Sequence, residues 1–472
     1  MIETKIKAQD KYVYALIACA FACIFITLFF GTLSSLYYIP SIAMKFKEYG
    51  LSLPQLRPMH DTFASAWIFL GGIAVVYKYI IDECAPLTVM DQFRYKLHMC
   101  MWGFAGIGII ISTLMGYTSG REYLSFPSFF SVFILGGWLL YAWNFLRHAL
   151  PGFWDKPAYI YMWTVSAFLF VYVFCEAHAY LLPSILNRPI ADMQIQWKSY
   201  GALVAAFNHL VYGSLMYLNE KLSNDKRYAH SMKAFSLLGI GLLNSFTNYA
   251  HHTYHLPQAH VIKWISFIVS MIEIIILYCV LSDIARNIRE NIYKNVQFTH
   301  YKFLYLSKNW TGGLLILAIL ISIPPLNTLI HGTHVVTAHA MGSEIGIDSF
   351  ALFAVLSFIL HRWLGETEGV HLNSKGLLRL ISTMNLSFVT LFLWLIFSGL
   401  SVGISSYLGT PRPWWVSYTP FFFAGFGSLL AVHILYLVCN WLLVLFRYRK
   451  IFFSKSISVA HPGLSHLNKF SR

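Results

Sequence analysis

The chain has 472 residues, of which 57% are hydrophobic and only 11% are charged. A soluble domain carries roughly 25% charged residues, so this composition excludes an ordinary soluble globular protein. The formal net charge of +14 would suit a nucleic-acid-binding protein, but no basic stripe accompanies a recognisable nucleic-acid-binding fold, and we expect no nucleic-acid partner.

Apolar runs of about 20 residues recur along the chain, which is the pattern of bilayer-spanning helices. We predict an all-α integral membrane protein with twelve transmembrane helices in a single membrane-embedded domain over residues 1–472. Residues 447–472 are predicted to form a basic cytoplasmic tail. The predicted spans, in chain order, are 13–38, 59–81, 97–117, 125–148, 158–183, 199–218, 232–252, 261–283, 311–330, 332–360, 379–402 and 418–446.

Basic residues are unevenly divided between the two sides of this predicted topology. The side that carries both termini has 26 of the 34 Lys and Arg residues, and the other side has eight. An excess of Lys and Arg marks the cytoplasmic side of a membrane protein. We therefore predict a multi-pass protein of the cell inner (cytoplasmic) membrane with both termini in the cytoplasm. The basic loops would also attract anionic membrane lipids.

Histidines within the apolar spans are the main functional signal. An ionisable side chain is costly inside a bilayer, so each is a candidate functional residue, and the alternative is a neutral imidazole bonded to a neighbouring helix. The histidines within or at the ends of the predicted spans are His60, His209, His251, His252, His334, His339 and His433.

Three of these histidines, from the sixth and seventh spans, suit a non-heme metal. His209 lies about ten residues, or about 15 Å, from the outer end of its span. His251 and His252 are adjacent at the outer end of theirs. Adjacent helical residues diverge by about 100°, so both can reach one ion only where the helix ends, and Pro257 marks such an end. Three neutral imidazoles from two helices would bind copper or iron.

His339 and Met341, in the tenth span, are two residues apart and therefore point about 200° apart on a helix. One helix can thus ligate two hemes on its opposite sides. We predict that His339 binds a high-spin heme whose open face meets the three-histidine metal. Met341 and His60, which begins the second span, are predicted to bind a low-spin heme. In the alternative, Met341 only packs and His334 is the ligand.

At these residues the chain resembles the heme–copper oxidase superfamily and, within it, the nitric oxide reductase branch. The resemblance extends from Lys11 to about Arg447. It implies a heme–copper oxidase subunit I type bundle, with the whole chain forming one catalytic domain. The segments that carry it are RPMHDTFASAWIFLG, SGREYLSFP, FNHLVYG, NYAHH, SMIEII and HGTHVVTAHAMG.

The resemblance also implies roles for residues that the spacing argument does not reach. Arg121 would bond the heme propionates, and Glu122 matches a residue that helps to bind a calcium ion between them. Glu273 follows His252 by 21 residues and matches a carboxylate close to the dinuclear centre. There it would supply protons or touch the non-heme metal.

Two positions depart from the family pattern. Met341 stands where the family usually has a second histidine. The best-known nitric oxide reductases carry a glutamate four residues after the first metal histidine, where this chain has Gly213. A carboxylate favours iron, whereas three imidazoles suit copper at least as well. Dioxygen-reducing relatives use a tyrosine near the copper, and Tyr212, one position from its commonest place, is a candidate catalytic residue.

The function that the resemblance implies is reduction of nitric oxide to nitrous oxide. The expected cofactors are two hemes, both heme b, one non-heme metal (iron or copper), and calcium. The alternative in the same class is a terminal oxidase that reduces dioxygen to water, as cytochrome c oxidase does. A secondary transporter would show two related halves, and the sequence shows none.

The seven cysteines contain no CxxCH heme-attachment motif and no CxxxC copper motif. The electrons for a heme near the outer face must therefore come from outside this chain. We predict either a small periplasm-facing subunit that carries heme c or copper, or a quinol, as the electron donor.

Overall fold

The computed structural model describes residues 6–291, 298–365, 367 and 370–453, with the side chains of 251, 252 and 291 excepted. Every regular element in these residues is a helix, which confirms the all-α prediction. The elements are α1 (Asp10–Leu36), α2 (Pro40–Glu48), α3 (Leu53–Glu83), α4 (Val89–Leu114), α5 (Phe129–Ala149), η1 (Phe153–Asp155), α6 (Ala158–Ala177), η2 (Ala179–Leu181), α7 (Pro183–Leu186), α8 (Pro189–Ser223), η3 (Tyr228–His230), α9 (Met232–Thr247), α10 (Tyr249–His252), α11 (His260–Asn291), α12 (Thr299–Ser322), α13 (Pro324–Ile330), α14 (His334–Met341), η4 (Gly342–Ser349), α15 (Phe350–Leu364), α16 (Lys375–Leu408), η5 (Trp414–Tyr418), α17 (Thr419–Arg447) and α18 (Arg449–Phe453).

Eleven helical segments among the described residues are long and apolar enough to cross a membrane, one fewer than the predicted twelve. The remaining predicted span, 232–252, corresponds to α9, which has only 16 residues, and to α10 directly after it. Sixteen residues of α-helix extend about 24 Å, less than the roughly 30 Å hydrocarbon core, so α9 needs α10 to complete a crossing. Of the predicted basic tail, residues 454–472 lie outside the described part.

The ninth predicted span, 311–330, is wrong in its boundaries. α12 begins earlier, at Thr299, and ends at Ser322. Pro324 and Pro325 follow at once and begin the short helix α13. Proline lacks the N–H that would continue the helical hydrogen bonds and its ring clashes with the preceding turn, so the helix cannot extend through this point.

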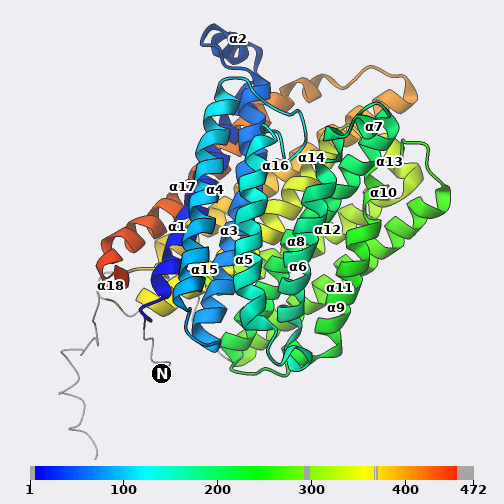
Figure 1. Cartoon of the computed structure of the whole chain (residues 1–472). Coiled ribbons are helices and arrows are strands. Elements are labelled where there is room, and N and C mark those ends of the chain that lie inside the picture. Colours follow the sequence, from blue (N-terminus) through cyan, green and yellow to red (C-terminus); the bar gives the residue numbers. More distant parts are fainter. Residues whose placement is uncertain (1–5, 292–297, 366, 368–369, 454–472) are drawn as a thin grey trace, which may run out of the picture.

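Both ends of the described chain lie at the same end of the helical bundle. The Phe452 ring of α18 lies 5.0 Å from the Tyr14 ring of α1. Figure 1 shows α2 and α7 at the opposite end, hereafter the distal end, together with α10 and α13. α10 and α14, which carry predicted ligands, lie toward this distal end.

The helices that carry most of the predicted ligands are also the most enclosed. The most apolar stretches of α3 and α8 are 83% and 89% buried, against 22% for α4. A helix that is apolar on all sides belongs in the interior of a bundle, whereas a peripheral one faces lipid. His60 and His209 therefore sit on enclosed helices, whereas Glu273 lies on α11, whose most apolar stretch is 39% buried.

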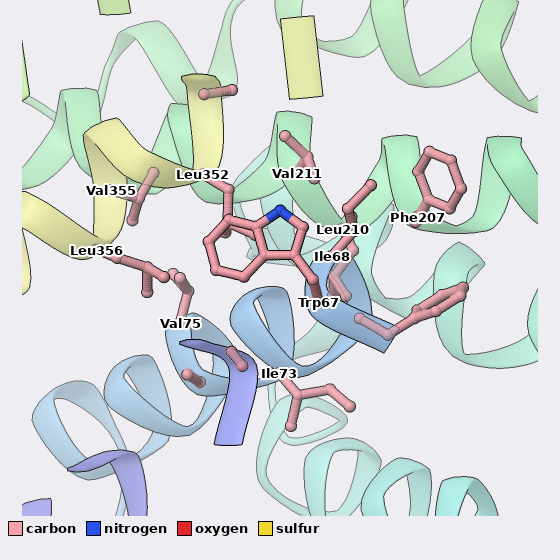
Figure 2. Packing of buried hydrophobic residues seen from close by; sticks show 14 of the residues in the cluster. Trp67, Ile68, Ile73, Val75, Phe207, Leu210, Val211, Leu352, Val355 and Leu356 are labelled. Atoms are coloured by element: carbon pink, nitrogen blue, oxygen red, sulfur yellow. The ribbon is translucent and has the colours of Figure 1, made fainter. Parts of the chain in front are cut away.

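Close packing locks α3 against α8 and α15. A Cβ on Gly71 would lie 2.5 Å from Leu352 Cδ2, and one on Gly72 would lie 2.4 Å from Leu210 Cδ2. Figure 2 shows the Trp67 indole of α3 beside Leu352 and among Leu210 and Val211 of α8. A larger residue at either glycine would have to displace the leucine side chain that fills the space, because protein interiors leave little spare volume.

A π-helical segment, η4, interrupts the span formed by α14 and α15. Its wider turn is supported by side chains of neighbouring helices. Ser307 Oγ of α12 donates to the Ile347 carbonyl at 3.0 Å, and Trp67 Nε1 donates to Ser349 Oγ at 3.1 Å. π-Helical turns are rare and occur frequently at functional sites.

Candidate functional site

His60 occupies the third turn of α3 with its ring against α1. Its Nδ1 lies 2.9 Å from the Thr27 carbonyl oxygen, and a carbonyl can only accept, so Nδ1 carries the proton. A Cβ on Gly31 would lie 2.5 Å from the same nitrogen, so glycine is needed for this approach. The Nε2 lone pair is then available for a metal, which is the usual arrangement of a ligating histidine.

His209 shows the same arrangement inside α8. Its Nδ1 donates to the Ala205 carbonyl at 2.7 Å. Its side chain is buried, and Nε2 has no hydrogen-bond partner among the described residues. A buried polar nitrogen without a partner is costly, and binding a metal would satisfy it.

Glu273 of α11 approaches the same point as His209. A Cβ on Gly241 of α9 would lie 3.2 Å from His209 Nε2 and 3.4 Å from Glu273 Oε1. The Asn244 amide donates to Glu273 Oε2, and Ser270 Oγ in turn donates to Asn244 Oδ1 at 2.8 Å. The carboxylate is therefore held in a fixed orientation beside the imidazole.

The side chains of His251 and His252 lie outside the described part of the structure. Their helix, α10, packs against α8 and α11, which carry His209 and Glu273. Among the described side chains, no group of three or more His, Cys, Asp and Glu residues is arranged to hold a metal ion. The three-histidine metal site thus stays a prediction.

His339 and Met341 lie on α14, immediately before the π-helical segment. His339 Nδ1 is buried and has no hydrogen-bond partner among the described residues. Met341 is partly buried and packs against the cluster of Ala338, Leu391 and Leu395. This contact is what the alternative prediction, in which Met341 only packs, requires of Met341. His334, the heme ligand in that alternative, is exposed.

Arg121 and Glu122 lie in the loop between α4 and α5 and are held by different partners. The Arg121 guanidinium donates to Asp192 and Gln196 of α8 at 3.0 and 3.1 Å. Glu122 Oε1 accepts from Arg57 at 2.8 Å. Burial raises the pKa of the Glu122 carboxyl, and Arg57 opposes this rise. Because Glu122 is already paired with a cation, its role in calcium binding stays a prediction.

Tyr212 is buried in α8 and interacts electrostatically with Asp348 and Glu273. Gly213, where the best-known nitric oxide reductases carry a glutamate, faces α6. A Cβ there would lie 2.7 Å from Trp163 Nε1 and 3.3 Å from the Tyr159 carbonyl oxygen. A glutamate at 213 would therefore clash with α6, and Glu273 is the carboxylate nearest to His209 in the contacts described above.

The donor set fits the hemes and metal that the sequence implies. His60 and His209 each have Nδ1 committed to a backbone carbonyl, which leaves Nε2 for iron or copper. A metal on Nε2 of the buried His209 would satisfy a nitrogen that has no hydrogen-bond partner among the described residues. The structure brings Glu273 together with His209, and it places Tyr212 close to both Glu273 and Asp348.

Three residues near the site, Tyr123, Glu344 and Asp348, were not predicted from the sequence. Tyr123, which has a positive φ of 57°, donates from its hydroxyl to Glu344 Oε1 at 2.7 Å. Glu344 and Asp348 both lie within the π-helical segment, and Asp348 is fully buried. A signal for both acids was present, because carboxylates within a membrane span are functional candidates by default.

Comparisons with known proteins identify the family to which this fold belongs. The family model for cytochrome c and quinol oxidase polypeptide I matches residues 11–448 of the chain. A solved structure reported as a heme-copper terminal oxidase dimer superposes with a TM-score of 0.71 at 13% identity. The match covers 96% of this chain and 85% of that one. No curated protein matches the sequence.

At 13% identity the solved structure shows the shared fold, whereas the family model covers nearly every residue from α1 to α17. Members of this family typically bind hemes and a metal at a dinuclear centre, and the orphaned imidazoles described above suit that role. The chain therefore belongs to the cytochrome c and quinol oxidase polypeptide I family and is a multi-pass membrane oxidoreductase that depends on heme.

Proposed function

We propose that this chain is the catalytic subunit of a membrane-bound nitric oxide reductase. The observation that carries the proposal is the convergence of Glu273 and His209 on Gly241. A carboxylate beside imidazoles favours iron at the non-heme site. The sequence resemblance points the same way, because a glutamate 21 residues after the His-His pair is characteristic of the nitric oxide reductase branch.

The chain's own side chains would divide the work as follows. His209, His251 and His252 would hold the non-heme metal, His339 the high-spin heme, and His60 with Met341 the low-spin heme. When bound, these groups supply electrons and bind the nitrogen oxide. Glu273, oriented by Asn244, would hold a proton beside the metal site.

The overall reaction sets what the protein must deliver. Two nitric oxide molecules, two electrons and two protons give nitrous oxide and water. The electrons would come from a small periplasm-facing subunit with heme c or copper, or from a quinol. We infer that the protein lies in the inner membrane with both termini in the cytoplasm, since the side of the predicted topology that carries the termini has 26 of the 34 Lys and Arg residues.

Reduction of dioxygen to water is the second candidate. It is favoured by Tyr212, which is buried one turn after His209, and by the absence of a carboxylate at Gly213. It is also favoured by the solved structure of similar fold, which is reported as a terminal oxidase. In this case three imidazoles without a carboxylate ligand would suit copper.

Anaerobic turnover of the purified protein with its donor distinguishes the two functions. We expect nitrous oxide to form from nitric oxide, with one electron consumed per nitric oxide molecule. His209→Ala should abolish this turnover while the low-spin heme spectrum stays unchanged. Rapid consumption of dioxygen without formation of nitrous oxide from nitric oxide would contradict the proposal and support the second candidate.

A further inference from the structure

Asp348 is an acidic side chain within a membrane-spanning segment whose surroundings do not match its polarity. It is fully buried, and neither carboxylate oxygen has a hydrogen-bond partner among the described residues. It lies within the continuous span His334–Leu364. An ionised carboxylate without a partner costs far more in an apolar interior than a neutral one, so the fold favours the neutral acid.

The π-helical segment places a second acid next to it. Glu344 and Asp348 are four residues apart in η4. A π-helix bonds to the fifth residue along and winds more slowly than an α-helix, so residues four apart lie nearly above one another. The two carboxyl groups interact electrostatically, as do Asp348 and Glu273. From their spacing, Glu344 and Asp348 lie on one face of the helix.

This face connects the candidate site with the loop between α4 and α5. Glu344 accepts a hydrogen bond from the Tyr123 hydroxyl of that loop at 2.7 Å. On the other side, Asp348 interacts with Tyr212, one helical turn from His209. Among the described residues, the titratable groups that interact electrostatically with Asp348 are Glu344, Glu273 and Tyr212, and none of these can be a cation.

We propose that Asp348 is a neutral carboxylic acid that carries protons to the reaction centre, an inference that rests on the proposed function. The Asp348 O–H bond breaks as its proton passes toward Tyr212 and Glu273, where the reduced substrate takes it up. The carboxylate then regains a proton that enters along Tyr123 and Glu344. No electron moves in either step, so the acid is regenerated in each cycle.

The protonation state can be tested without turnover. The infrared spectrum of the resting protein at neutral pH should contain a carbonyl band of a protonated carboxyl group that shifts in D₂O. Because Glu273 and Glu344 can contribute carboxyl bands of their own, the test is the difference spectrum: the band should lose one component in Asp348→Asn and keep its full intensity in Ser357→Ala, a control for a buried polar residue of the same span. If Asp348→Asn does not retain its hemes, labelling the native protein with carbon-13 aspartate identifies the acid instead.

Transport of protons is tested by rapid mixing of the reduced protein with nitric oxide. Asp348→Asn should slow proton uptake by roughly 10²-fold, the range of an acid–base group, with unchanged heme content and optical spectra. Uptake at the native rate, or a carboxyl band of undiminished intensity in Asp348→Asn, would overturn the proposal. If the native protein reduces only dioxygen, the proposed function fails, and the same two measurements with dioxygen still decide the role of Asp348.

Discussion

At the scale of the residue, the surroundings of an imidazole decide whether it can be a ligand. His209 and His433 both direct Nδ1 to the carbonyl four residues earlier, at 2.7 Å in each case. The local hydrogen bond is therefore the same. His209 is buried and its Nε2 has no hydrogen-bond partner among the described residues, whereas His433 is only partly buried and its hydrogen bond is exposed. Burial among other helices, and not the helical bond, makes His209 the candidate.

His209→Ala should lower the non-heme metal content by more than roughly 10-fold. Removing a residue that only hydrogen-bonds to a metal ligand already costs about that much affinity, and loss of the ligand itself should cost more. The two hemes should remain, because their predicted ligands lie on α3 and α14. Elemental analysis and the optical spectrum measure both quantities. His433→Ala is the matched control and should leave metal and hemes unchanged. Equal metal content in the two variants would show that His209 is not a ligand.

For Met341 the surroundings do not identify a ligand. Its contact with Leu391 and Leu395 is also what a packing residue would make. If Met341 ligates the low-spin heme, Met341→Ala should change that heme's spectrum and lower its reduction potential, because a thioether ligand raises the potential. Met341→His should keep the heme low-spin at a lower potential. A redox titration that finds the same potential in all three proteins would assign Met341 to packing.

At the scale of the element, α9 shapes the candidate metal site by what it lacks. A side chain on Gly241 would meet His209 and Glu273, whereas one on Gly239 would meet nothing within 4 Å. We expect Gly241→Val to displace both side chains and to reduce metal affinity by roughly 10- to 100-fold. Gly239→Val is the control on the same helix and should bind metal normally. Full metal content in the Gly241→Val protein would show that Gly241 of α9 does not shape the metal site.

The span of α14, η4 and α15 shows how an irregular helix changes the chemistry it presents. His339 and Met341 precede the π-helical turn, and Glu344 and Asp348 lie within it. The wider turn leaves carbonyls to be bonded by side chains, as the Ile347 carbonyl is by Ser307. One span therefore combines two predicted heme ligands with two acids, of which Asp348 is buried and Glu344 partly buried.

At the scale of the whole molecule, the distal and terminal ends of the bundle should be accessible to a cysteine-labelling reagent from opposite sides of the membrane. Tyr49 follows α2 at the distal end and is 82% exposed, and Arg227 follows α8 at the terminal end. A membrane-impermeant maleimide added to intact cells should label Tyr49→Cys and not Arg227→Cys. Both should be labelled after the membrane is broken.

The unsubstituted protein measures the background from its own cysteines, of which Cys100, Cys175, Cys279 and Cys439 are exposed on the helices. Labelling of Arg227→Cys but not Tyr49→Cys in intact cells would place the termini outside and contradict the distribution of basic residues.

The sequence by itself determined the helical class, the approximate positions of the spans and the residue types of the candidate site. Hydrophobic runs long enough to cross a bilayer permit only helices or closed barrels, because backbone groups must be bonded internally. Histidines at His60, His209 and His339 stood out because an ionisable group inside such runs is costly. These are local properties of the chain and need no knowledge of neighbours.

The tertiary structure alone decided which side chains meet. Spacing along a helix fixes the angle between two of its residues, but not which neighbouring helix each one faces. The contacts of His60 with Thr27 and of Glu273 with Asn244 join different helices and have no signature in spacing. The π-helical turn that aligns Glu344 with Asp348 likewise depends on support from α3 and α12. Packing between helices, which no local pattern encodes, therefore assembles the site.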